Sequence, residues 1–130
     1  MNKEFIPYEQ SVALKELGFD EPCFRYVYIG DTGNNCHHYI EVKPSKGENF
    51  NVKPLCISQP TFSQAFRWFR EKFGYYADLF VDDDKTFGFM ISSFVKEGVL
   101  EKPIQRNYSS YEETELACLI KLIEIVKNSK

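Results

Sequence analysis

The chain has 130 residues, of which 43% are hydrophobic and 16% aromatic. This composition supports a folded core and excludes a disordered chain. The formal net charge of −3 argues against general nucleic-acid binding, which usually shows a basic excess. No long apolar run occurs in the sequence, so no membrane partner is expected. These features predict a single compact domain that covers residues 1–130.

The four cysteines are Cys23, Cys36, Cys56 and Cys118. No two of them have the C-x-x-C spacing, and the N-terminus lacks the apolar stretch of a signal peptide. We therefore expect reduced thiols and a cytoplasmic location.

The first half of the chain predicts one helix and one β-hairpin. Proline suits the first position of a helix and glycine the position after its end, which indicates a helix over 7–17 followed by Gly18. Aromatic and β-branched residues predict strands over 23–29 and 36–42, joined by the turn-rich sequence GDTGNN. Residues 43–54 have loop composition, and a short strand over 55–57 is expected before the next helix.

The second half repeats the order of helix, glycine, strand, polar turn and strand. A helix is expected from the N-cap Thr61 to Gly74, then strands over 75–81 and 86–92. Residues 95–107 are expected to be irregular. The last helix begins at Ser110, which forms an S-x-x-E capping box with Glu113. The predicted fold is α+β, in the order α-β-β-α-β-β-α, with the two hairpins forming one antiparallel sheet packed by three helices.

The helix within PTFSQAFRWFREKFGYY (60–76) holds the only tryptophan. Five residues share about 100° of the helix surface and are expected to form its buried stripe: Phe62, Ala65, Phe66, Phe69 and Phe73. Trp68 lies on one shoulder of this stripe, where it either completes the core edge or offers a contact surface. Arg67 and Arg70 lie on the opposite shoulder. Arg67 is spaced to pair with Glu71, whereas Arg70 can project over the sheet toward a phosphate or carboxylate.

The segment CHHY contains both histidines of the chain, His37 and His38, followed by Tyr39. Alternation along a strand sends the two histidines to opposite faces, so they cannot jointly bind one ion. Residues 82–84 are three aspartates without the spacing of a calcium loop. A Cys36–histidine nucleophile would need an orienting group that the sequence does not show. No metal, cofactor or catalytic residue is therefore predicted, and one histidine is expected to face a ligand as a donor.

Three stretches, IPYEQSVALKELGFDEPCF, PTFSQAFRWFREKFG and YEETELACLIKLIEIVK, resemble small accessory proteins encoded by phages and prophages of gut bacteria. That group has no established activity. The resemblance therefore implies a setting, a small phage protein made in the host cytoplasm, and not a mechanism.

Small phage proteins without catalytic motifs commonly act by binding. One class resembles this chain in size and character, namely oligomeric sponges that sequester nucleotide signals of bacterial anti-phage immunity. A sponge needs aromatic rings for a base and cationic side chains for phosphates. The candidates for such a site are Trp68, Arg70, Arg67, His37, His38, Tyr39 and Arg25. We therefore expect a non-enzymatic, phage-encoded sponge for a nucleotide immune signal.

The wide apolar face of the last helix further predicts a homo-oligomer, since surplus apolar surface often marks an interface. The alternative function is an inhibitor or adapter that docks on a host protein through Trp68 and the strand face formed by Phe24, Tyr26 and Tyr28. An enzyme such as a small nuclease is less favoured, because no paired catalytic residues occur at a recognisable spacing.

Overall fold

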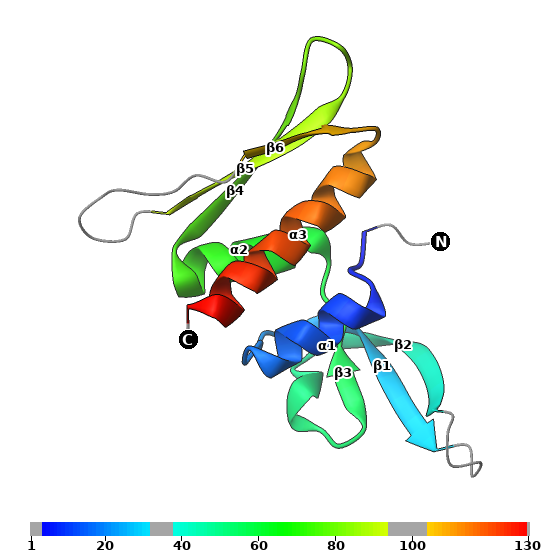
Figure 1. The fold of residues 1–130 in the computed structure, drawn as a ribbon. Helices are drawn as coiled ribbons and strands as arrows, with labels where there is room; N and C mark the ends of the chain where they lie inside the picture. The colour runs from blue at the N-terminus through cyan, green and yellow to red at the C-terminus, as the bar shows by residue number, and fades with distance from the viewer. Residues whose placement is uncertain (1–3, 32–37, 94–103, 130) are drawn as a thin grey trace. The chain divides into compact units, whose positions relative to one another are not determined.

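The structure is a computed structural model that describes residues 4–31, 38–93 and 104–129, with side chains described outside residues 30–46. The chain divides into two compact units, residues 2–61 and residues 62–130. Each unit contains one three-stranded antiparallel sheet (Figure 1). The predicted α+β class and order of elements are confirmed. The single shared sheet is corrected, because each hairpin gains a third strand and forms a sheet of its own.

The first unit begins with helix α1 (Tyr8–Glu16). Pro7 occupies the N-cap, and the helix ends where Gly18 adopts φ of 97°. The Gly18 N–H donates to the Lys15 carbonyl at 3.0 Å, and the Phe19 N–H donates to the Leu14 carbonyl at 2.9 Å. This pair of bonds is a Schellman motif, which only a left-handed residue at this position allows. The predicted stop of the helix is therefore confirmed, and the motif directs Phe19 into the core, where it is buried.

The sheet of this unit has the strand order β2-β1-β3. Strand β1 spans Cys23–Asp31, β2 spans His38–Glu48 and β3 spans Cys56–Ser58. The expected loop over 43–54 is wrong in its first part, because β2 continues to Glu48 before the short 3-10 helix η1 (Phe50–Val52). Pro44 is compatible with this strand because β2 lies at an edge, where a missing N–H costs no ladder bond.

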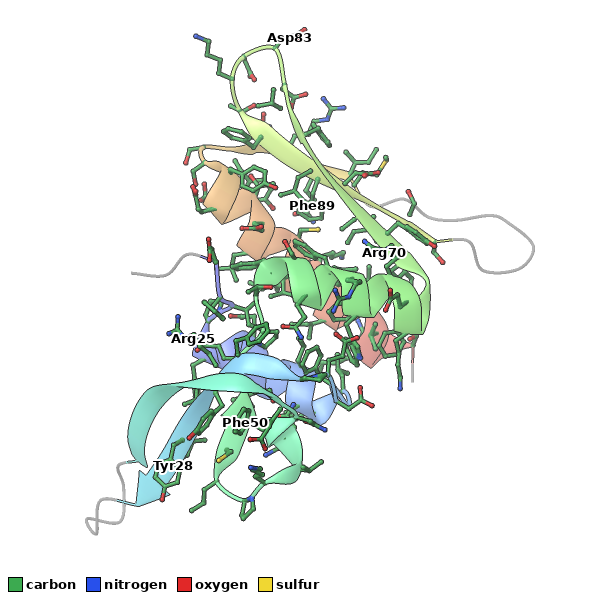
Figure 2. The ribbon with its side chains drawn as sticks, turned by 180° about the vertical axis from the view of Figure 1, so that it is seen from behind. Arg25, Tyr28, Phe50, Arg70, Asp83 and Phe89 are labelled. Atoms are coloured by element: carbon green, nitrogen blue, oxygen red, sulfur yellow. The ribbon has the colours of Figure 1, made fainter. Side chains whose placement is uncertain are left out.

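Asn51 in η1 fastens the chain to two separate segments. Its side-chain amide donates to the Phe19 carbonyl at 2.9 Å and accepts from the Ser58 N–H at 2.9 Å. The Ser58 hydroxyl in turn accepts from the Phe50 N–H at 2.9 Å. The Phe50 ring then stacks on Tyr26 with 3.9 Å between ring centroids. These contacts cover the middle of one face of β1, next to Tyr28 (Figure 2).

The second unit contains α2 (Phe62–Phe73), β4 (Tyr75–Val81), β5 (Phe87–Ser93), β6 (Ile104–Tyr108) and α3 (Tyr111–Asn128). The strand order is β4-β5-β6, so β6 corrects the expectation that residues 95–107 are irregular. Helices α2 and α3 contact each other, with α2 against β4 and α3 mainly against β5. The described residues contain no helix that is long and apolar enough to cross a membrane.

The two units do not share one topology, although their elements begin in the same order. In the first unit the central strand is β1, the first strand of its hairpin. In the second unit the central strand is β5, the second strand of its hairpin. The third strand therefore pairs with the first strand of the hairpin in one unit and with the second strand in the other. This difference argues against an internal repeat.

Candidate functional site

The buried side of α2 is rotated from the side that the sequence predicts. Its buried residues are Phe62, Ala65, Trp68 and Phe69, whereas Phe66 and Phe73 are only half-buried. The rotation is roughly 50° toward Trp68 at 100° per residue. A physical reason is that α2 packs against two elements, β4 and α3, so more than one narrow stripe is covered.

This rotation leaves one flank of α2 at the border of a hollow of about 380 Å³. Helix α2 forms one side of the hollow and the first turns of α3 form the other, with the middle of β4 between them. We call it the α2–α3 hollow. Its lining residues are Ser63, Phe66, Arg70, Ala77, Asp78, Leu79, Tyr111 and Glu115.

Arg70 is the only cation among the described residues that line the α2–α3 hollow. It projects from the exposed flank of α2 (Figure 2). Within the described part of the chain, its guanidinium makes no hydrogen bond, ion pair or ring contact. Its five N–H donors are thus available to a ligand, and their planar fork suits a phosphate or carboxylate.

Glu115 and Asp78 give the hollow an acidic component. Burial is the main reason that the pKa of Glu115 is raised above its ordinary value, and the neighbouring charge of Glu112 adds to it. Burial also raises the pKa of Tyr111, with a further contribution from Glu115. One cation facing two carboxylates favours a ligand that carries a single anionic group together with hydrogen-bond donors.

Cys118 follows Glu115 by three residues on α3 and is fully buried. Burial raises the pKa of its thiol to about 12, and the charges of Glu115 and Asp78 contribute to the shift. The thiolate is the reactive form of cysteine, so Cys118 is a core residue and not a nucleophile. The described residues contain no group of three metal-binding side chains that could hold an ion.

The two other candidates on α2, Trp68 and Arg67, do not line the hollow. Trp68 is 2% exposed and packs edge-on against Phe69 and Phe73, with 5.2 Å between ring centroids in each pair. It completes the core edge and is not a stacking surface. Arg67 is exposed on α2 but does not line the hollow.

Arg25 and the histidine segment belong to the first unit. The Arg25 guanidinium lies 4.3 Å from the centroid of the Phe5 ring, an arrangement that stabilises a cation by the ring's negative face. His37 lies outside the described residues. His38 and Tyr39 are in β2, opposite Asp31 and Gly30, and their side chains also lie outside the description.

Arg70 is the one sequence candidate that lines the hollow among the described residues, and the hollow's other polar groups were not predicted from the sequence. Tyr111 and Glu115 are four residues apart, which places them on one side of α3. This spacing was visible in the sequence. That this side of α3 borders Arg70 follows from the packing of α2 and α3, which local sequence patterns do not specify.

No family model, curated protein or solved structure matches this chain. The resemblance to phage accessory proteins therefore stays a prediction.

Proposed function

We propose that this protein is a non-enzymatic binding protein that sequesters a small nucleotide-type ligand in the α2–α3 hollow. The observation that carries the proposal is Arg70, a cation that has no partner among the described residues and lies at the border of a hollow whose size suits a small molecule. In this proposal the protein is phage-encoded and acts in the host cytoplasm as a homo-oligomer that withholds an immune signal.

The chemistry of the hollow defines the part of a nucleotide that fits. Arg70 suits one phosphate, by two parallel charge-assisted hydrogen bonds. Carboxylates accept hydrogen bonds from ribose hydroxyls, a role for Glu115. The rings of Phe66 and Tyr111 supply surface for a base. Because Glu115 and Asp78 repel further negative charge, a single phosphate or phosphodiester group is favoured over a polyphosphate.

The test is a panel of nucleoside monophosphates, cyclic dinucleotides and ADP-ribose derivatives, scored by thermal shift and calorimetry. A bound ligand stabilises the folded state by roughly 2.7 kcal/mol at a hundredfold excess over its Kd. Arg70→Gln should weaken binding by about 1.5–3 kcal/mol, the usual worth of a charged hydrogen bond. Recovery of intact ligand after denaturation should show that no turnover occurs.

The matched control is Lys72→Gln, which removes one positive charge from the same helix outside the hollow. It should leave binding close to that of the unaltered chain. A loss of binding with Arg67→Gln and not with Arg70→Gln would place the site elsewhere. No shift across the whole panel would refute the proposal.

A second candidate function, docking on a host protein, is favoured by one observation. Phe24 is 63% exposed on the same face of β1 as Tyr26 and Tyr28, and exposed aromatic side chains are common anchors of interfaces. Trp68 is buried and does not contribute to such a surface. A stoichiometric host partner that is lost with Phe24→Ala, in the absence of any nucleotide shift, would favour this candidate.

A further inference from the structure

Strand β4 forms one edge of the β4-β5-β6 sheet, and the turn that follows it shows which backbone groups face outward. The Asp82 N–H donates to the Thr86 carbonyl at 2.8 Å, and the Lys85 N–H donates to the Asp82 carbonyl at 2.9 Å. These two bonds define a three-residue hairpin loop, in which Lys85 adopts the left-handed conformation with φ of 67°. Asp82 therefore occupies a hydrogen-bonded position opposite β5.

Hydrogen-bonded and non-hydrogen-bonded positions alternate along an antiparallel pair. Counting back from Asp82, residues Phe80 and Asp78 direct their N–H and C=O groups toward β5. Ala77 and Leu79 then direct theirs away from the sheet. No backbone hydrogen bond within the described ranges engages this outward row. Such a row is a template for another strand.

The two edges of this sheet are built differently. Strand β6 carries a bulge between the positions paired with Phe87 and Phe89, a left-handed Asn107 with φ of 74°, and the charged Arg106. Each of these features discourages pairing at an edge. Strand β4 (YYADLFV) keeps an unbroken register with β5 and contains no proline, lysine or arginine. Only Asp78 brings a charge to it.

We propose that β4 pairs in antiparallel register with β4 of a second copy of this chain. An antiparallel pair of identical edges is self-complementary about a two-fold axis, so each outward N–H meets an outward carbonyl. Pairing also covers part of the apolar surface at the strand's ends, where Val81 is 62% and Tyr76 is 39% exposed. This inference does not depend on the ligand proposed above.

Asp78 and the end of α2 select the register. A register centred on Asp78 places it opposite the partner subunit's Asp78, and like charges directly opposite are destabilising. A register centred on Ala77 places helical Phe73 opposite the partner subunit's Val81, where no ladder can form. The register centred on Leu79 avoids both problems and places Ala77 opposite the partner subunit's Val81.

This interface differs from the one that the sequence predicts. The last helix, α3, buries Cys118, Leu119, Leu122 and Val126 within its own chain. Of its predicted apolar stripe, Ile120 is the residue that stays exposed, at 46%. The surplus apolar surface on α3 is therefore small, and the β4 edge is the stronger candidate for self-association.

The first test uses the unaltered chain, by light scattering and amide exchange over a range of concentrations. The mass should rise from 15.2 kDa to twice that value. At high concentration, exchange of the Ala77 and Leu79 amides should slow about tenfold or more, while Asp78 and Phe80 are protected throughout. A constant monomer mass would overturn the proposal, and so would a dimer in which the Ala77 and Leu79 amides still exchange rapidly.

Two variants sharpen this test. Leu79→Pro removes the central outward donor and should give a folded monomer by circular dichroism; a folded Leu79→Pro dimer would overturn the proposal. If Leu79→Pro does not fold, Asp78→Asn provides the test. This substitution removes the repulsion between the two Asp78 side chains, so it permits the register centred on residue 78, in which all seven residues of β4 pair. Asp78→Asn should tighten the dimer at least about threefold, and an unchanged dimer affinity would refute the proposed register.

Discussion

At the residue scale, Glu115 makes the stability of the second unit depend on pH. Its pKa is raised in the folded state, mainly by burial. The folded state thus binds a proton more readily than the unfolded chain, so stability falls as pH rises through the window from the ordinary value near 4.5 to the raised folded value. The favourable contribution is complete below that window and lost above it.

Glu115→Gln should therefore stabilise the protein at neutral pH and make little difference near pH 4. Urea unfolding of the two proteins at both pH values measures this directly. Glu124→Gln is a matched control, because Glu124 is exposed on the same helix and pairs with Lys121 at 2.8 Å. A Glu115→Gln variant that is less stable than the unaltered protein at neutral pH would contradict the assignment of a half-buried carboxyl that makes no ion pair among the described residues.

Single residues also show how far the sequence can predict the site. Helical angles place Arg67 and Arg70 on the same shoulder of α2, because residues three positions apart share one side of a helix. The same angles left Trp68 undecided between core and surface. Its burial depends on how far α2 turns between β4 and α3, a tertiary property that periodicity within one helix does not contain.

At the element scale, the start of α3 is fixed by two serines and one glutamate. The Ser110 hydroxyl accepts from the Glu113 N–H at 3.1 Å, as the capping box predicts. The Glu113 carboxylate accepts from the N–H and hydroxyl of Ser109, at 3.0 and 2.9 Å, so the return bond reaches one residue further back. These bonds, led by the Ser109 hydroxyl, lower the pKa of Glu113.

Ser110→Ala should lower the free energy of unfolding by about 1 kcal/mol, the usual cost of losing an N-cap. Ser109→Ala should cost less, because the Ser109 N–H still donates to Glu113. Denaturant midpoints of both variants measure the ranking. A Ser110→Ala variant as stable as the unaltered chain would show that the cap does not act through Ser110.

Elements with strong local signals were predictable, and elements that depend on distant partners were not. Local sequence features predict where some elements begin or end. Such features are the caps, the glycine stops and the aromatic runs of helix α1, helix α3 and strand β4. Strand β6 (IQRNY) has polar residues and no alternation, and its described burial is low. It forms a strand because it pairs with the edge of β5, and no local sequence pattern predicts that this edge is available.

At the scale of the whole molecule, the second unit carries a core of its own. Phe69 from α2, Phe89 from β5 and Leu119 from α3 are each fully buried. The first unit, residues 2–61, is comparable in length to the second unit. This length is close to the lower limit for independent folding. Within the described residues, the second unit has helices of 12 and 18 residues and the first has one α-helix of 9 residues, so the second unit is expected to be the more stable.

We predict that a fragment of residues 62–130 folds alone. It should show helical circular dichroism and a cooperative thermal transition. The fragment of residues 2–61, which lacks a second long helix, should be only marginally stable at the same temperature. A disordered 62–130 fragment would contradict this prediction and would instead support one indivisible domain over residues 1–130.

The bulge in β6 also identifies a position at which the length of this chain can change during evolution. Arg106 and Asn107 together face Gly88, where an added side-chain carbon would lie only 2.6 Å from the Phe80 ring and from the Gln105 carbonyl. Tyr108 follows the bulge and stacks on Phe89 with 6.1 Å between ring centroids. Deleting one of the two bulged residues would leave Tyr108 opposite Phe87 and on the same face as Gln105, because Gln105 and Tyr108 would then be two positions apart. The bulge is therefore the place in β6 where the chain can lose one residue while Tyr108 keeps its contact with Phe89.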